Sequence, residues 1–176
     1  MPTVRSLVAT LFALSLPLGA QSVTPASIHS AITGHWIGTL EYKDYSNPNR
    51  RVTLPTILDA APRDEGGAAL HFIYDDGPGK TVTGGDRFIL SADARALDWT
   101  GVKEQSPEIF RVVSLLRNED GGTIQLVAER EGQDDNKPAT LRETITIGKT
   151  ELTILKEVRP NGTDFSFRHV YHFTRR

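Results

Sequence analysis

The chain has 176 residues, no cysteine and a formal net charge of −2 at pH 7. Without cysteine it has no disulfide, no zinc–thiolate site and no thiol nucleophile. A charge this close to neutral, with no extended basic cluster, gives no electrostatic support for nucleic-acid binding.

The first twenty residues have the three parts of a secretory signal peptide. Arg5 supplies the positive charge, residues 7–18 form an apolar run, and Gly19 and Ala20 offer small residues to a peptidase. The run is too short to cross a bilayer, which takes roughly 20 apolar residues. We therefore expect cleavage after Ala20 and export to the periplasm or the extracellular space. No later apolar stretch is long enough to span a membrane.

Residues 21–33 are expected to form a leader with one short helix. Thr24 is a suitable N-cap and Pro25 suits the first helical position. Ile28 and Ile32 are four residues apart, which places them on one face of the helix. Residues 34–176 then form a single domain.

About ten strand candidates follow, separated by turns rich in Gly, Pro, Asn and Asp. They span residues 36–43, 51–58, 69–74, 81–90, 96–100, 109–117, 123–130, 140–147, 151–158 and 165–174, with a long polar turn at 131–138. No helix long enough for a parallel crossover lies between them, so neighbouring strands should be antiparallel. Because a closed sheet has no edges, we predict an all-β fold, an up-and-down antiparallel β-barrel of about ten strands. The alternative is a two-sheet sandwich.

Side-chain alternation along these strands selects an inner set that is rich in aromatic rings with polar tips. The candidate ligand-binding residues are Tyr42, Phe72, Tyr74, Phe88, Trp99, Glu143, Phe167, His169 and Tyr171. Buried polar groups need partners, so several of them on one inner wall indicate an interior that is partly wet or occupied by a ligand. Alternatively, Glu143 and His169 lie in solvent near the barrel mouth, or a bulge shifts the register.

The segment Gly34-His35-Trp36 opens the first strand directly after the short helix. It resembles the Gly-X-Trp signature of the lipocalins and the wider calycin superfamily. That resemblance implies that the tryptophan closes one end of the barrel and that an arginine late in the chain packs across it. The candidates for this arginine are Arg168, Arg175 and Arg176.

Gly38 extends the motif to Gly-X-Trp-X-Gly, which resembles the opening of the ten-stranded nitrobindin-like barrels. Lipocalins proper have eight barrel strands and usually a C-terminal helix, so about ten strands and a final strand favour a ten-stranded or irregular calycin-like barrel. Nitrobindin-like proteins hold haem with a histidine late in the chain, which makes His169 a candidate haem ligand. The alternative is that His169 is an ordinary polar residue of the last strand.

No catalytic motif and no metal-ligand spacing is present in the sequence. His169 and His172 are three residues apart on a strand and should face opposite sides. We expect a monomeric or weakly oligomeric barrel that binds or carries a small, mostly apolar molecule of drug size in its interior. The alternatives are a barrel enzyme or haem protein using His169, with Glu143 as a second enzymatic group, and an envelope protein with a filled core. The sequence identifies neither the ligand nor a cofactor.

Overall fold

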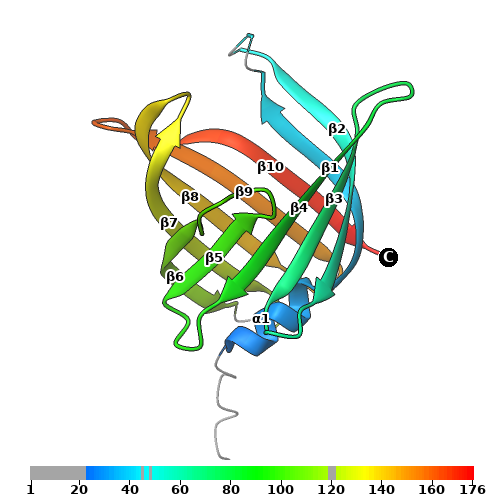
Figure 1. The fold of residues 1–176 in the computed structure, drawn as a ribbon, viewed down its shortest axis with the longest axis vertical. Helices are drawn as coiled ribbons and strands as arrows, with labels where there is room; N and C mark the ends of the chain where they lie inside the picture. The colour runs from blue at the N-terminus through cyan, green and yellow to red at the C-terminus, as the bar shows by residue number, and fades with distance from the viewer. Residues whose placement is uncertain (1–22, 45, 48, 119–121) are drawn as a thin grey trace, which may run out of the picture.

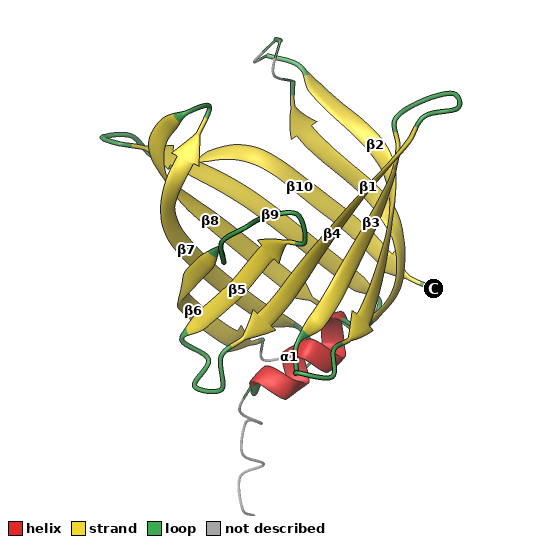
Figure 2. Cartoon of the chain, in the orientation of Figure 1, coloured by secondary structure: helices red, strands yellow, loops and turns green. Residues whose placement is uncertain are grey.

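A computed structural model describes residues 23–44, 46–47, 49–118 and 122–176. The expected signal peptide, residues 1–20, and the first two residues of the leader lie outside the described residues. The described residues form one helix and ten strands (Figures 1 and 2). These are α1 (Pro25–Ile32), β1 (Gly34–Lys43), β2 (Arg51–Pro62), β3 (Ala68–Asp75), β4 (Thr81–Leu90), β5 (Ala96–Gly101), β6 (Ile109–Arg117), β7 (Ile124–Asp134), β8 (Lys137–Ile147), β9 (Glu151–Pro160) and β10 (Ser166–Arg175).

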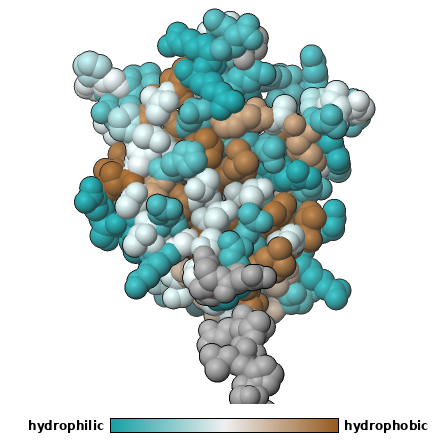
Figure 3. Space-filling model, turned by 180° about the vertical axis from the view of Figure 1, so that it is seen from behind, coloured by the Kyte–Doolittle hydropathy of each residue, from teal (hydrophilic) through white to brown (hydrophobic). Residues whose placement is uncertain are grey.

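The ten strands form a closed antiparallel barrel. Each strand pairs with the next along the chain, and β1 pairs with β10 to complete the ring. The predicted all-β barrel is confirmed, and the sandwich alternative is wrong because no sheet edge separates two layers. Inner faces hold the buried core, whereas the outer surface in Figure 3 shows small groups of hydrophobic residues scattered among hydrophilic ones.

The helix α1 closes one end of the barrel (Figure 2). Thr24 caps it through a reciprocal hydrogen-bonded box with Ser27. Ile28 and Ile32 are fully buried against the core. The backbone N–H of Leu90, at the end of β4, donates a 3.0 Å hydrogen bond to Nε2 of His29. The helix is therefore held both by apolar packing and by a bond to the barrel wall.

Trp36 lies fully buried at this closed end. Its Nε1–H donates a 2.8 Å hydrogen bond to the carbonyl of Ile32, one of the carbonyls that the helix end leaves without a helical partner. Of the three candidate arginines, Arg175 stacks on this tryptophan, with Cζ 4.0 Å from the ring centroid. Its guanidinium also donates to the carbonyls of Ala31 and Thr33.

The long polar turn expected at 131–138 is wrong. Strands β7 and β8 continue to Asp134 and Lys137, which pair with each other. The connection is a two-residue turn, in which Asp135 and Asn136 have φ angles of 49° and 60°. Positive φ at both positions is the pattern of a type I′ hairpin, which Asp and Asn tolerate. Polar residues near the barrel rim can meet water and still belong to strands.

A β-bulge in β10 changes the facing of the last strand. Phe167 pairs with Glu157 and His169 pairs with Lys156, so Arg168 is the extra residue. Phe167 therefore shares the outer face of Glu157, and the guanidinium of Arg51 lies over its ring, 3.8 Å from Cζ to centroid. The inward assignment of Phe167 is wrong, because alternation counted back from His169 does not allow for the inserted residue.

Candidate functional site

The barrel interior contains a cavity of about 200 Å³. Its lining residues are Phe72, Asp86, Trp99, Gly101, Glu104, Glu108, Phe110, Glu143, Lys156, His169 and Tyr171. Five of the nine predicted site residues are among them. Pockets for drug-sized ligands usually measure about 300–1,000 Å³. The expected room for a molecule of drug size is therefore not present, and the cavity suits something smaller.

Aromatic rings form one side of the cavity. The rings of Phe72 and Tyr171 are 5.2 Å apart between centroids, and Tyr171 stacks in turn on Phe173 at 5.6 Å. Trp99, on β5, meets Phe88 edge to face at 5.5 Å. Offset and edge-to-face pairs of this kind fix ring orientation, so this wall is preorganised to receive an apolar group.

The remaining predicted residues have other positions. Tyr74 stacks on Phe72, with centroids 6.0 Å apart, and its hydroxyl is 3.0 Å from that of Tyr171. Phe88 is fully buried beneath Trp99. Tyr42 borders a separate recess that it shares with His169. Together with the outward-facing Phe167, these four predicted residues do not line the cavity itself.

Glu143 is the most deeply buried carboxyl group of the cavity wall. Its side chain is 7% exposed, and its Oε1 lies 3.3 Å from Nζ of Lys156. Its Oε2 is buried and has no hydrogen-bond partner in the described part of the chain. Burial raises the pKa of Glu143 to about 7, although the ammonium group of Lys156 opposes this rise. The carboxyl is thus poised between its two protonation states near neutral pH.

Asp86 contributes a second carboxyl group from β4. Its Oδ2 accepts a 2.9 Å hydrogen bond from Nε1 of Trp99. Burial raises the pKa of Asp86, whereas the bond from Trp99 acts in the opposite direction. Burial also raises the pKa of Tyr171 well above its usual value, so its phenol keeps its proton. The wall therefore presents a proton donor and several acceptors.

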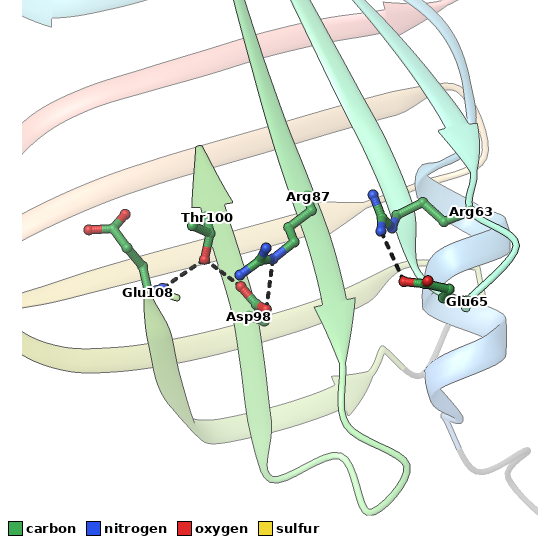
Figure 4. Close-up of polar contacts among 6 residues, drawn as sticks. All are labelled: Arg63, Glu65, Arg87, Asp98, Thr100 and Glu108. Carbon is green, nitrogen blue, oxygen red and sulfur yellow. Dashed lines mark hydrogen bonds and ion pairs between the residues drawn. The ribbon is translucent and has the colours of Figure 1, made fainter. Parts of the chain in front are cut away.

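Glu108 is positioned by a chain of polar contacts across β4, β5 and the start of β6 (Figure 4). Its backbone N–H donates a 2.7 Å hydrogen bond to Oγ1 of Thr100. The Thr100 hydroxyl donates to Asp98, which also accepts a 2.9 Å bond from Nε of Arg87. This chain holds the segment between β5 and β6 against the barrel, so that Glu104 and Glu108 border the cavity.

The side chain of Glu108 forms an ion pair with Arg130 of β7. The guanidinium of Arg130 lies over the ring of Phe110, 5.2 Å from Cζ to centroid. One carboxylate of the wall is thereby neutralised by a cation that already rests on an aromatic face.

His169 projects into the cavity just after the bulge. Its ring meets Tyr171 edge to face, with centroids 5.4 Å apart. Burial, together with the nearby charges of Lys156 and Arg168, lowers the pKa of His169 to about 3. The imidazole is therefore neutral at physiological pH. Arg168 itself pairs with Asp134, 2.9 Å from Nε to Oδ1, on the neighbouring hairpin.

Five lining residues were not predicted as site residues: Asp86, Glu104, Glu108, Phe110 and Lys156. Alternation contained a signal for three of them. Asp86 is two residues before the inward Phe88, Glu108 is two before Phe110, and Lys156 is two after the buried Ile154. Polar residues in step with a buried apolar series mark an inner wall. Glu104 lies between strands, where alternation gives no guidance.

No cluster of three or more His, Asp or Glu side chains able to hold a metal ion is found among the described residues. Within the same residues, no helix is long and apolar enough to cross a membrane.

No family model and no curated protein matches this sequence. Solved structures do match it. Rv2717c from M. tuberculosis has a TM-score of 0.63 at 15% identity, over 88% of this chain and 99% of that one. The S-type phycobiliprotein lyase CPES from Guillardia theta has a TM-score of 0.59 at 10% identity, over 89% of this chain and 94% of that one.

The chain shares the fold of these two solved structures. Identities this low establish a shared architecture and leave the chemistry of each barrel to its own residues. What is shared is the closed antiparallel barrel.

Proposed function

We propose that this protein binds and carries a small organic molecule, held non-covalently inside the barrel. The observation that supports this most directly is Glu143, a buried carboxyl group of the cavity wall whose Oε2 has no hydrogen-bond partner among the described residues. Leaving such a group unsatisfied costs about 1–3 kcal/mol, and more when it is charged. A ligand group at that position would remove the cost.

The ligand is expected to have two parts. An apolar part is desolvated against Phe72, Trp99 and Tyr171, which contributes roughly 25 cal/mol for each Å² removed from water. A polar part reaches Glu143 and fixes the orientation. The sequence suggested a mostly apolar ligand, and a polar group on it is needed here because a wholly apolar ligand would leave Oε2 of Glu143 without a partner. A barrel of the same fold is a phycobiliprotein lyase in Guillardia theta, which supports a ligand-handling role for this architecture.

The proposal includes the compartment. Residues 1–20 have the features of a secretory signal, so the carrier is proposed to act in the periplasm or outside the cell as a monomer or weak oligomer.

The haem alternative fits the cavity poorly. A neutral imidazole at His169 has the right protonation state for an iron ligand. However, a cavity of about 200 Å³ is small for a macrocycle, and a wall with the carboxyl groups of Asp86, Glu104, Glu108 and Glu143 does not favour a group that carries two propionates. The filled-core alternative is opposed by the cavity itself.

Ligand-observed NMR with a panel of one-ring fragments tests the binding proposal. We expect fragments to bind the wild-type protein and the Phe167→Ala variant, in which the lost ring lies outside the barrel. Phe72→Ala should weaken binding, because this ring lines the cavity. Absence of binding to the wild-type protein, or equal effects of both variants, would contradict the proposal.

A further inference from the structure

The charges around the cavity are unbalanced. Its wall includes four carboxyl side chains and one amine, from Asp86, Glu104, Glu108, Glu143 and Lys156. Arg130 pairs with Glu108 and balances one of the acids. Clefts lined by one sign of charge with low-dielectric walls concentrate the electrostatic potential. The cavity therefore attracts cations and disfavours anions.

The unpartnered oxygen adds a second, independent observation. Oε1 of Glu143 is already bound to Lys156, whereas Oε2 is buried and unpaired in the described structure. An ionised carboxylate can only accept hydrogen bonds. A group that satisfies Oε2 must then be a donor, and a charged donor forms the stronger bond.

The aromatic wall suits the same type of group. Cations are attracted to the faces of Trp, Tyr and Phe rings within about 6 Å. Trp99, Phe72 and Tyr171 border the cavity beside the carboxyl groups. The protein already contains one such contact at this site, between Arg130 and Phe110.

We propose that the ligand is an organic cation, an ammonium group on an aromatic or otherwise apolar body. The ammonium group donates to Oε2 of Glu143, and the body lies against Phe72, Trp99 and Tyr171. This inference rests on the proposed function and specifies the ligand class. A metal ion is not the cation proposed, because the described residues provide no cluster of three His, Asp or Glu ligands.

The inference predicts a direction for the pH dependence of binding. The pKa of Glu143 is about 7, set by burial and by the charges of Lys156, Arg130 and Glu108, while Asp86, Tyr171 and the neutral His169 also face the cavity. An ammonium group binds the ionised carboxylate. Its affinity should therefore rise as the pH increases through about 7, a range in which alkylammonium groups stay charged.

Titration calorimetry with three one-ring probes of similar size tests the ligand class: 2-phenylethylamine, 2-phenylethanol and 3-phenylpropionate. For the full-length protein at about pH 8, we expect the amine to bind at least about tenfold more tightly than the alcohol, and the carboxylate to bind most weakly. Between about pH 8 and about pH 6, the affinity for the amine should fall about tenfold, because ionised Glu143 becomes scarce.

Two variants with the same change of charge localise the effect. Glu143→Gln should reduce the affinity for the amine about tenfold, to that of the alcohol, and leave the alcohol itself unaffected. Glu157→Gln is the matched control, because Glu157 lies next to Lys156 in sequence but pairs with Arg142 on the outer face. This control should change the affinity for the amine less than about twofold.

The outcomes separate the two proposals. If no probe binds the wild-type protein, the binding function itself is overturned. If probes bind but the carboxylate or alcohol equals the amine, or if Glu143→Gln leaves the affinity for the amine unchanged, only the cationic ligand class is overturned. Selectivity and pH dependence in the wild-type protein give this answer even if Glu143→Gln does not fold.

Discussion

Gly34 leaves the space that the guanidinium of Arg175 occupies at the closed end of the barrel. A Cβ atom on residue 34 would overlap Nη1 of Arg175, the atom that donates to the carbonyl of Thr33. Gly34 also has a φ of 142°, which side chains rarely allow. Glycine is thus needed at the first position of the Gly-X-Trp motif, because the arginine that stacks on the tryptophan occupies the space of a side chain there.

A double-mutant cycle tests this match. Gly34→Ala should destabilise the protein by about 1–3 kcal/mol through backbone strain, with a further cost from displacing Arg175. In an Arg175→Ala background the second cost disappears, so the same substitution should cost less. Urea denaturation measures the coupling. Additive effects of the two changes would show that the two residues do not constrain each other.

Arg175 itself is expected to stabilise the helix end. Removing it as Arg175→Ala leaves the carbonyls of Ala31 and Thr33 without their charged donor, at a cost of about 2 kcal/mol. Arg176→Ala is the matched control, because the backbone N–H of Arg176, which bonds to His35, is retained. The free energies of unfolding from urea titrations should differ between the two variants. Equal values would contradict the structural role of Arg175.

Trp36 should be among the most sensitive core positions. Trp36→Ala removes a fully buried ring and is expected to cost about 3–5 kcal/mol. Trp36→Phe keeps most of the ring but leaves the carbonyl of Ile32 unpaired, which costs about 1–3 kcal/mol. The neighbouring Ile37 faces outward and is 39% exposed, so Ile37→Ala serves as a control with a small effect. A change below about 1 kcal/mol for Trp36→Ala would show that this end of the barrel tolerates loss of the ring.

The barrel and its helix were predictable because local signals agreed. Thr24 and Pro25 mark the start of α1, and turn residues separate the strands at regular intervals. Alternation then placed Phe72, Trp99 and Tyr171 correctly on the cavity wall. These features depend on residues that are close in sequence, so sequence patterns can predict them.

The assignment of side chains to the inner or outer face fails where one inserted residue shifts the alternation of a strand. The bulge at Arg168 turns Phe167 outward, although alternation predicted that this ring faces the interior. The position of a bulge depends on how the strand pairs with its neighbour, and the residues around the bulge do not reveal that pairing. The ion pairs of Lys156 and Arg130 likewise depend on which strands become neighbours.

The export expectation makes a direct prediction about the mature chain. Because residues 7–18 form an apolar run followed by small residues, the exported protein should begin at Gln21 or within a few residues of it. N-terminal sequencing of material recovered from outside the cytoplasm measures this. Retention of Met1 in that material would contradict cleavage.

The stability of the protein should depend on pH through two buried groups with opposite effects. For Glu143, the pKa rises from 4.5 to about 7 on folding, so the native state holds a proton that the unfolded chain has lost between these values. Its contribution to stability is complete below about pH 4.5 and is lost as the pH rises through about 7. For His169, the pKa falls from 6.5 to about 3, so its contribution is complete above about pH 6.5 and is lost as the pH falls toward 3.

Over the range from about pH 4.5 to 6.5 the two effects oppose each other, so the wild-type protein should show little dependence on pH there. Single variants uncover each contribution. Relative to the wild type, Glu143→Gln should gain stability between about pH 5 and pH 8, by up to about 3 kcal/mol, because it no longer has to bury a charge. His169→Gln should gain stability relative to the wild type between about pH 6.5 and pH 4. The wild type loses stability in this range because its imidazole is neutral in the native state and protonated in the unfolded chain. Urea titrations at several pH values measure both. If each variant followed the pH profile of the wild type, the two side chains would not be buried as the structure places them.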